Sequence, residues 1–471
     1  MKNKKVKIVA TLGPASHSPE MIRKLALTGV DVFRLNLSHQ RRDSITHLVK
    51  TIRLIEKKLK KPLSIMGDLG GLKVRVGQVK ENTILKNGDT IKISTAPVIG
   101  SKEIISINQP SLIRQLKKGT QILVDDGLIK LVVTRALTGN TAQAEVEVGG
   151  VLLSNKGFYA SDISLSSLGI PEKDESDIKF MHKVGADAIA CSFVQSDYDV
   201  MQVKERLPAD SDIVIIAKIE TKQAVSNIEK IIDVSDGIMI ARGDLGLAMP
   251  IAEVPMLQKK LIALCLKKAK PVITATQMLE SMTKSPFPTR AEVADVANAI
   301  LDGTDAIMLS DETATGKYPL EAVEVMSNVV ETTSPHIQIR EFDRETQVSN
   351  VVSSSAGLIA NKVGAKVILV FTQSGFTALQ IARLRYPQEV IVGLTPSKKT
   401  LRLLNFCWGV YPMYMHISSI PSFDHALSEA RKFVQNNSII KLQKGEPYVV
   451  VTGLPLNQSG ITNLIHVGKV E

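Results

Sequence analysis

The sequence predicts an α/β protein built on a (β/α)8 TIM barrel, with an inserted β-barrel lid domain and a C-terminal open α/β-sheet domain. Two observations carry this prediction. Eight short apolar runs rich in Val, Ile and Ala alternate with stretches of helical periodicity, the pattern of parallel strands buried on both faces. Each run also ends in polar residues or glycine, as strands do at the catalytic end of a barrel.

Three apolar runs precede a long interruption and five follow it. They are residues 7–13, 30–38, 63–69, 186–194, 212–220, 236–246, 271–277 and 305–313. Eight strand-and-helix units in series favour a closed barrel over an open sheet. We therefore assign residues 1–69 and 167–335 to the catalytic barrel.

Residues 70–166 have a different pattern. Alternating segments, such as residues 72–79 and 83–94, are separated by turn sequences, among them Asn87-Gly88-Asp89 and Thr138-Gly139-Asn140. This pattern predicts a small β domain inserted in a barrel loop. On the catalytic face of the barrel, such a domain is expected to close over substrate and exclude water.

The third domain is assigned to residues 336–471. A polar connection over residues 331–350 precedes it, and apolar runs at 366–371, 390–394 and 448–453 then alternate with helical stretches such as 378–384. This alternation predicts an open α/β sheet.

Composition narrows the class of protein. The net charge of the 471 residues is +11, but the basic residues are scattered and aromatic residues are only 4%, which disfavours nucleic-acid binding. No apolar run approaches the roughly 20 residues that span a bilayer. Three widely spaced cysteines, Cys191, Cys265 and Cys407, argue against a disulfide framework and favour the cytoplasm.

Charged residues end two neighbouring strands of the predicted barrel. Glu220 and Asp244 offer two carboxylates, the donor set that Mg²⁺ prefers in proteins. Lys218 lies two residues before Glu220, so both side chains point to the same face of the strand. We expect Lys218 to stabilise a phosphoryl group or an enolate, although a structural ion pair is the alternative.

Other strand ends carry groups suited to anions. Arg34 and Asn36 share a face, and arginine suits phosphate, although Arg34 alone fits a surface ion pair equally well. Thr276 is expected at the barrel mouth, with helix capping as the alternative. In the third domain a hydroxyl-rich loop before a helix suits a phosphorylated effector or is an ordinary helix cap; it contains Thr372, Ser374, Gly375 and Thr377.

The chain resembles the pyruvate kinase family along its whole length. The motifs that carry the resemblance occur in the family's order: TLGPAS from Thr11, RLNLSH from Arg34, VDDGLI from Val124, KIE from Lys218, ARGDLG from Ala241, ATQMLESM from Ala275, PTRAEVADVAN from Pro288 and LSDETA from Leu309. Long strings in a fixed order are far more specific than a single glycine motif.

The resemblance implies transfer of a phosphoryl group from phosphoenolpyruvate to ADP, giving pyruvate and ATP in the last step of glycolysis, with Mg²⁺ or Mn²⁺ held by Glu220 and Asp244. It further implies a homotetramer and an allosteric sugar phosphate or nucleotide. The implied substrate groups are Lys218, Arg34 with Arg75, the backbone of Gly243 and Asp244, and Thr276 on the side where the enol is protonated. Asn36, Asp126 and Lys156 would approach the nucleotide.

Two departures from the family pattern stand out. Most members bind potassium through groups equivalent to Asn36, Ser38, Asp68 and the carbonyl of Leu69, but residues 68–76 read DLGGLKVRV, with Lys73 at the usual glutamate. An ammonium group is a fixed monovalent cation, so we expect no potassium requirement; a solvated lysine on the lid hinge is the alternative. Asp311 replaces the usual glycine, and its effect stays open.

Two other functions are the alternatives to phosphoryl transfer. A Mg²⁺-dependent barrel lyase acting on phosphoenolpyruvate or pyruvate would equally need Glu220 and Asp244 to stabilise an enolate. A noncatalytic metabolite sensor would rely on the third domain alone. The presence of Lys218, the inserted lid and the ordered motifs favour phosphoryl transfer over both.

Overall fold

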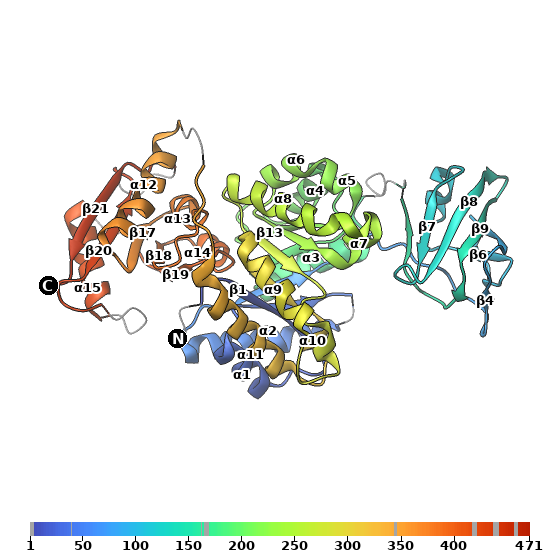
Figure 1. The fold of residues 1–471 in the computed structure, drawn as a ribbon, viewed down its shortest axis with the longest axis horizontal. Helices are drawn as coiled ribbons and strands as arrows, with labels where there is room; N and C mark the ends of the chain where they lie inside the picture. Colours follow the sequence, from blue (N-terminus) through green and yellow to red (C-terminus); the bar gives the residue numbers. More distant parts are fainter. Residues whose placement is uncertain are drawn as a thin grey trace.

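The structure is a computed structural model that describes residues 4–38, 40–161, 163, 169–342, 346–416, 422–436, 442–455 and 460–471. Three bodies lie in a row, with the inserted domain at one end, a barrel in the middle and the C-terminal domain at the other end (Figure 1). Within these ranges, none of the helices is both long enough and apolar enough to cross a membrane.

The barrel closes as predicted. Its strands are paired in parallel in the cyclic order β1-β16-β15-β14-β13-β12-β3-β2, and β1 pairs with both β16 and β2. Their bounds are β1 Lys7–Leu12, β2 Val32–Asn36, β3 Ser64–Asp68, β12 Ala188–Cys191, β13 Val214–Ile219, β14 Gly237–Ala241, β15 Val272–Ala275 and β16 Ala306–Leu309.

The predicted strands were longer than the observed ones, and two of them extended into helices. Residues 242–246 belong to helix α7 (Arg242–Ala248), and residues 311–313 belong to helix α10 (Asp311–Ala314). Both helices begin within one residue of the end of their strand, so no turn sequence marks the boundary. The helix starts bring backbone N–H groups to the mouth of the barrel.

Helices surround the barrel and bury their apolar faces against it. Helix α1, for example, turns Ile22, Leu25 and Ala26 to the core, and Ser18 caps its start by accepting from the N–H of Met21. The outer helices are α1 Pro19–Thr28, α2 Arg42–Leu59, α3 Glu172–Val184, α4 Asp197–Glu205, α5 Lys222–Ser226, α6 Ile228–Val234, α8 Val254–Lys267, α9 Arg290–Asp302 and α11 Pro319–Thr333.

Four aspartates fasten the amino-terminal end of the barrel. Each aspartate directly precedes a strand. Its N–H donates to the carbonyl of a residue in the neighbouring strand, and its carboxylate accepts the N–H of that same residue. The pairs are Asp31 with Ile8 (2.9 Å), Asp187 with Ile65 (2.7 Å), Asp236 with Ile215 (2.8 Å) and Asp305 with Val272 (3.0 Å), the distances being those to the carboxylates. We call these four residues the aspartate staples.

The inserted domain is a sheet with its own apolar core. Six strands run in the order β11-β7-β8-β9-β5-β6: β11 Phe158–Ala160, β7 Gln121–Val124, β8 Ile129–Thr138, β9 Thr141–Val148, β5 Thr90–Ser94 and β6 Ile104–Ser106. Strands β4 (Ile84–Leu85) and β10 (Gly150–Val151) pair separately. The turn predicted at residues 138–140 joins β8 to β9.

The segment at residues 72–79, expected as a strand, forms only isolated bridges. Arg75 pairs with Gly157 beside β11, and Val76 pairs with Ile107 beside β6. Val79 pairs with Gly100. The two glycines Gly70 and Gly71 precede this segment, and its pairing changes among three partners, so no continuous ladder forms. It nevertheless joins the two edges of the six-stranded sheet.

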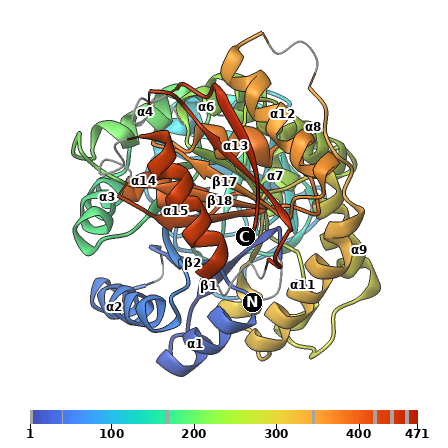
Figure 2. The same cartoon turned by 90° about the vertical axis from the view of Figure 1, so that its left-hand side faces the viewer.

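The C-terminal domain is the predicted α/β sheet, in the order β19-β18-β17-β20-β21 with only β21 antiparallel. Its elements are α12 Val348–Val363, β17 Val367–Phe371, α13 Phe376–Ala382, β18 Val390–Thr395, α14 Lys398–Leu404, β19 Val410–Tyr414, α15 Phe423–Asn436, β20 Pro447–Thr452 and β21 Leu464–Lys469. Seen end on, it lies in front of the barrel (Figure 2).

The C-terminal domain also closes the amino-terminal end of the barrel. Phe406 belongs to the same buried cluster as the side chains of the barrel interior, among them Val9 and Ile216. Asn405 donates to the carbonyl of Asp31 (3.1 Å) and to the hydroxyl of Ser64 (3.0 Å). The opposite end of the barrel, which faces the inserted domain, is therefore the open one.

Candidate active site

Charged side chains from three barrel strands meet at the end that faces the inserted domain. Arg34 on β2 donates from Nε to Asp68 Oδ2 at 2.6 Å, and Lys218 on β13 donates from Nζ to Asp68 Oδ1 at 3.2 Å. Burial would raise the pKa of Asp68, but Lys218 and Arg34 outweigh it and hold that pKa below its usual range. Asp68 is therefore a buried carboxylate that stays ionised.

Lys218 has three oxygen partners. Besides Asp68, its Nζ donates to Ser192 Oγ at 2.7 Å and lies 2.9 Å from Glu220 Oε1. Burial favours the neutral amine, but Asp68 and Glu220 overcome this effect and raise the pKa of Lys218. The side chain is thus a fixed positive charge at the mouth of the barrel.

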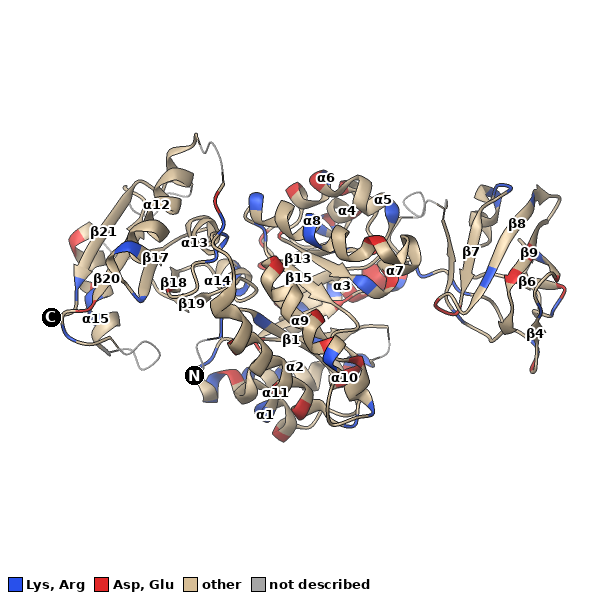
Figure 3. Cartoon of the chain, viewed as in Figure 1, with Lys and Arg blue, Asp and Glu red and all other residues tan. Residues whose placement is uncertain are grey.

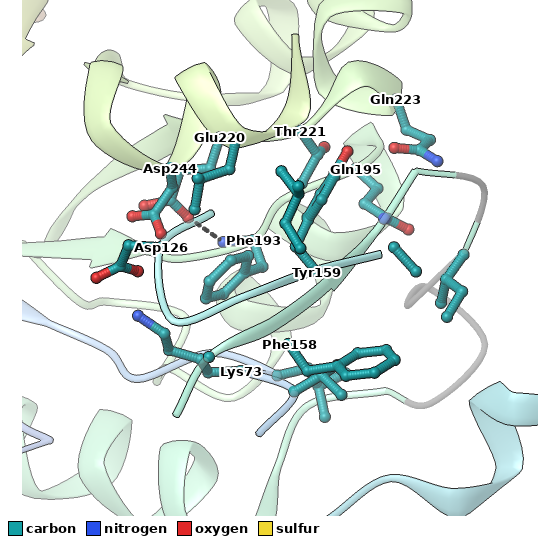
Figure 4. Close-up of a pocket in the computed structure, with 17 residues that line it drawn as sticks. Lys73, Asp126, Phe158, Tyr159, Phe193, Gln195, Glu220, Thr221, Gln223 and Asp244 are labelled. Atoms are coloured by element: carbon teal, nitrogen blue, oxygen red, sulfur yellow. Dashed lines mark hydrogen bonds between the residues drawn. The ribbon is translucent and has the colours of Figure 1, made fainter. Parts of the chain in front are cut away.

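Glu220 and Asp244 lie side by side at the cleft between the barrel and the inserted domain (Figure 4). Burial raises the pKa of Glu220, and the neighbouring Asp244 carboxylate raises it further, against the opposing effect of Lys218. Glu220 Oε2 also accepts from the N–H of Phe193 at 2.7 Å. The prediction that these two carboxylates converge agrees with this arrangement.

Thr276 lies beside the first turn of α7. Its hydroxyl accepts from the N–H of Gly243 at 2.8 Å and donates to the carbonyl of Ala275 at 2.6 Å. The hydroxyl therefore binds the first turn of α7 and does not cap the helical turn that follows Thr276 in the sequence. Thr276 has φ +68° and Gln277 φ +54°. Arg242 fixes this strained turn by donating to the carbonyl of Thr276 at 2.8 Å.

The inserted domain contributes to the cleft from the opposite side. Lys73 and Asp126 line it together with Glu220 and Asp244. Asp126 is placed by a tight turn between β7 and β8, in which it has φ +52°. Lys156 instead pairs with Asp125 at 2.9 Å, and Arg75 donates to the carbonyl of Asn155 at 2.9 Å.

Comparison with known proteins identifies the family. The model of the pyruvate kinase barrel domain matches residues 3–323, and that of the pyruvate kinase alpha/beta domain matches residues 350–468. The chain belongs to the pyruvate kinase family. It is 38% identical to a pyruvate kinase of Methylorubrum extorquens, covering 100% of this chain and 98% of the relative. It is 39% identical to pyruvate kinase 2 of Synechocystis, covering 99% and 80%, and 39% identical to a pyruvate kinase of Staphylococcus aureus, also covering 99% and 80%.

Three of the four groups that the pyruvate kinase resemblance assigns to potassium have protein partners in this structure: Asn36, Asp68 and the carbonyl of Leu69. Asn36 Oδ1 accepts from the N–H of Ser38 at 3.0 Å, and the carbonyl of Leu69 accepts from Ser192 Oγ at 2.8 Å. Asp68 is occupied by Arg34 and Lys218 as described above. Within the described ranges Lys73 has no carboxylate partner within 4.0 Å, and it lines the cleft instead.

The loop expected to bind an effector is tightly bonded within the C-terminal domain. Thr372 Oγ1 accepts from the N–H of Gly375 at 2.9 Å, and the hydroxyls of Thr377 and Thr462 lie 2.6 Å apart. Thr372, Thr377 and Thr462 are all buried. Thr372 closes the turn before α13 but does not cap that helix, whose N-cap is Gly375 without a side-chain cap, so effector binding stays a prediction.

The other departure, Asp311, needs no special backbone. It is the first residue of α10 and is exposed, and its φ is not among the positive values. The following Glu312 is fully buried and accepts from the N–H groups of Ser310 (2.7 Å) and Leu279 (3.1 Å). Glu312 thus ties together the loops after β15 and β16.

The sequence did not predict the importance of three residues around the site. Ser192 was expected only as a polar strand end, yet it bonds Lys218. Phe193 was not singled out, although its N–H holds Glu220. Asp174 accepts from the N–H groups of Gly70 (3.3 Å) and Gly71 (2.8 Å), which begin the inserted domain. No spacing signal marks these contacts, because each joins residues distant in the chain.

Proposed function

We propose that the protein transfers the phosphoryl group of phosphoenolpyruvate to ADP, giving pyruvate and ATP in the last step of glycolysis, with Mg²⁺ or Mn²⁺ as cofactor. One observation carries the proposal: a permanently protonated Lys218 stands between Asp68 and Glu220 at the barrel mouth, opposite an inserted lid. Membership of the pyruvate kinase family supports the same reaction.

The carboxylates at the cleft fit a divalent cation. Burial raises the pKa of Glu220, and repulsion by the adjacent Asp244 adds to this effect; a bound cation would relieve the repulsion. The described residues contain no cluster of three or more acidic, histidine or cysteine side chains, but Mg²⁺ needs only one or two carboxylates with water and substrate oxygens. The bound ion would neutralise charge on the substrate oxygens.

Lys218 and Arg34 provide the positive charge for the phosphoryl group. Phosphoryl transfer depends mainly on positioning and on electrostatic stabilisation of spread-out negative charge. Lys218 would stabilise the transferring phosphoryl group and the enolate, and Arg34 would bind phosphoryl oxygens. Asp68 holds both cations at fixed positions, with distances of 3.2 and 2.6 Å, so little reorganisation is needed when substrate binds.

The first turn of α7 suits the carboxylate of the substrate. The N–H groups of Gly243 and Asp244 lie at the start of this helix, where free backbone donors favour an anion. Gly243 now donates to Thr276, so its N–H would change partner on binding. Thr276 would then stand beside the carbon that is protonated, and its hydroxyl would pass the proton through water.

The lid residues would complete the nucleotide site. Asp126 already faces the metal carboxylates across the cleft (Figure 4). When the lid closes, Lys156 would approach the nucleotide, which Asn36 at the end of barrel strand β2 would also contact, and Arg75 would help Arg34 to bind the phosphoryl group. Lys156 carries a charge that Asp125 now neutralises, so closure would exchange this partner for a phosphate. A closed lid excludes water and protects the phosphoryl group from hydrolysis.

We further propose that Lys73 makes added potassium unnecessary. Its ammonium group lines the cleft that contains Glu220 and Asp244 and would supply there the monovalent charge that potassium supplies elsewhere in the family. Activity should change less than about threefold when potassium replaces a large organic cation, and Lys73→Glu should make activity depend on potassium. The exposed lid residue Lys102, changed to glutamate, is the matched control.

Three further properties complete the proposal. The protein would be a homotetramer, as the resemblance implies, and a phosphorylated effector would bind near Thr372, Ser374, Gly375 and Thr377. It would be cytoplasmic, because all three cysteines are free and buried. No membrane or nucleic-acid partner is proposed, and basic residues are distributed over all three bodies in the view of Figure 3.

One assay tests the reaction. Protein, Mg²⁺, ADP and phosphoenolpyruvate are mixed without potassium, and pyruvate and ATP are followed together. Equal amounts of both products are expected. Pyruvate without ATP would indicate a lyase or hydrolase, and neither product, even with potassium and sugar phosphates added, would indicate a noncatalytic sensor.

A further inference from the structure

Phe193 connects the barrel with the inserted domain. It follows strand β12 of the barrel, yet its side chain packs against the apolar core of the inserted domain. The ring also lies against Gly71, at the start of the inserted domain, because a Cβ added to this glycine would lie 2.8 Å from Phe193 Cδ2. In Figure 4 the side chain of Phe193 lies between Glu220 on the barrel side and Lys73 on the lid side.

The backbone of Phe193 holds a carboxylate of the active site. Its N–H donates to Glu220 Oε2 at 2.7 Å, the bond drawn in Figure 4. The preceding residue, Ser192, accepts from Lys218 Nζ at 2.7 Å. One dipeptide therefore orients both the proposed metal ligand and the fixed positive charge.

The backbone of Phe193 is strained at the residue whose N–H donates to Glu220. Its φ is +55°, a left-handed conformation that is costly for an aromatic residue and that persists only where the surroundings enforce it. The ring contacts with the lid core and with Gly71 are the surroundings that fix this residue. Without them the backbone would relax to negative φ and turn the N–H away from Glu220.

We propose that Phe193 is a positioning residue that couples the seating of the lid to the orientation of Glu220. The lid core holds the ring, the ring holds the strained backbone, and the backbone N–H orients the carboxylate. The proposal rests on the proposed function, because it takes Glu220 as a metal ligand. It goes further by giving the lid an effect on metal binding before any substrate is present.

Two substitutions of one residue separate this coupling from simple packing. Phe193→Ala removes the ring and leaves a residue that avoids φ +55°, whereas Phe193→Gly removes the ring but tolerates that φ. Binding of Mn²⁺ to the full-length protein without substrate, followed by electron paramagnetic resonance of the free ion, should weaken about tenfold in the alanine variant. In the glycine variant it should weaken less than about threefold.

Equal weakening in both variants, or a greater weakening with glycine, would overturn the proposal, because packing of the ring alone would then explain the loss. A second pair guards against misfolding of the alanine variant. Gly71→Ala places a methyl group against the Phe193 ring and against Ser192, and so against both residues of the dipeptide, and it should weaken Mn²⁺ binding at least threefold. Gly88→Ala, with a similar φ of +85° and no atom within 4 Å, should leave binding unchanged; an equal effect of both would contradict the coupling.

Hydrogen exchange tests the coupling in the opposite direction. Mn²⁺ should slow exchange in strand β11 (Phe158–Ala160) of the wild type but not of Phe193→Ala, and equal slowing in both would overturn the proposal. Glu220→Gln separates this inference from the metal assignment on which it rests. If that variant bound Mn²⁺ as well as the wild type, the assignment of the metal site itself would be wrong.

Discussion

Both ends of the barrel bury charged side chains, and the two sets differ in what surrounds them. At the amino-terminal end, Asp187 and Asp305 accept backbone N–H groups and pair with arginines, beneath the C-terminal domain. At the opposite end, Asp68 also pairs with two cations, but one of them, Lys218, also pairs with Glu220, which borders an open cleft. Buried charge alone therefore does not mark an active site; buried charge beside a cleft does.

The largest effect expected from this difference is on catalysis. Lys218→Met should lower kcat by at least about 10³-fold, roughly 4 kcal/mol of barrier, because it removes the fixed charge on the phosphoryl group. The free energy of unfolding should change less than when a buried arginine loses its carboxylate, because Arg34 still pairs with Asp68 and Glu220 borders the open cleft. Steady-state kinetics and urea unfolding measure the two. A loss of activity matched by an equal loss of folded protein would contradict the distinction between the two ends.

The amino-terminal end should respond in the opposite way. Asp305→Ala leaves the fully buried Arg385 without the carboxylate that lies 3.0 Å from it, which should cost about 4 kcal/mol of unfolding free energy. The kcat of the folded fraction should stay within about twofold. Urea unfolding and active-site titration test both statements.

The matched control is Asp236→Ala, another aspartate staple. Its carboxylate accepts the N–H of Ile215 and has no arginine or lysine within 4.0 Å among the described residues. This change should cost only about 1 kcal/mol. If both substitutions lowered the free energy of unfolding equally, the bond from the aspartate carboxylate to the backbone N–H, and not the buried ion pair with Arg385, would dominate stability at this end.

A smaller effect concerns pH. Burial lowers the pKa of Lys5 to about 8, although Glu389 opposes this shift. Because the folded pKa is below that of the unfolded chain, unfolding takes up a proton between pH 8 and pH 10.5, and stability rises with pH across this window. Lys5→Met should remove about 2 kcal/mol of that rise. Urea unfolding at pH 7 and pH 10 measures it, with the exposed Lys24→Met as control.

An unchanged pH dependence in Lys5→Met would show that Lys5 stays charged throughout this range. The amino-terminal end would then resemble the catalytic end, where the pKa of Lys218 is raised and not lowered. The contrast between the two lysines follows from their partners, because Lys218 faces two carboxylates, whereas Lys5 donates to a backbone carbonyl.

The fold was predictable because its signals are local. Eight apolar runs ending in polar residues predicted the closed barrel, and this prediction is confirmed. The ends of two strands were wrong because α7 and α10 begin without a turn sequence. In the C-terminal domain β19 and β21 were not predicted. The limits at residues 69/70, 166/167 and 335/336 stay predictions.

The site was predictable only in part. Lys218, Glu220 and Asp244 could be proposed from charges at strand ends, and the motifs supported them. The partners that orient these groups could not, since the Ser192 hydroxyl meets Lys218 only when the barrel closes, and Phe193 acts through a backbone N–H at a positive φ that its residue type does not predict. The aspartate staples were visible in principle, because each aspartate directly precedes an apolar run, but their contacts depend on barrel closure.

The smallest effect concerns the joint between the barrel and the C-terminal domain. Arg402 on α14 donates to Glu56 at 2.6 Å and lies 2.9 Å from Asp187, which Arg53 of the barrel also contacts at 2.6 Å. Arg402→Met should therefore cost about 1.5 kcal/mol of unfolding free energy and speed hydrogen exchange in α14. Arg53→Met breaks contacts to the same carboxylates within the barrel and should leave α14 unaffected. Faster exchange of α14 in both variants would mean that the carboxylates, and not the arginine that crosses between the domains, hold the two bodies together.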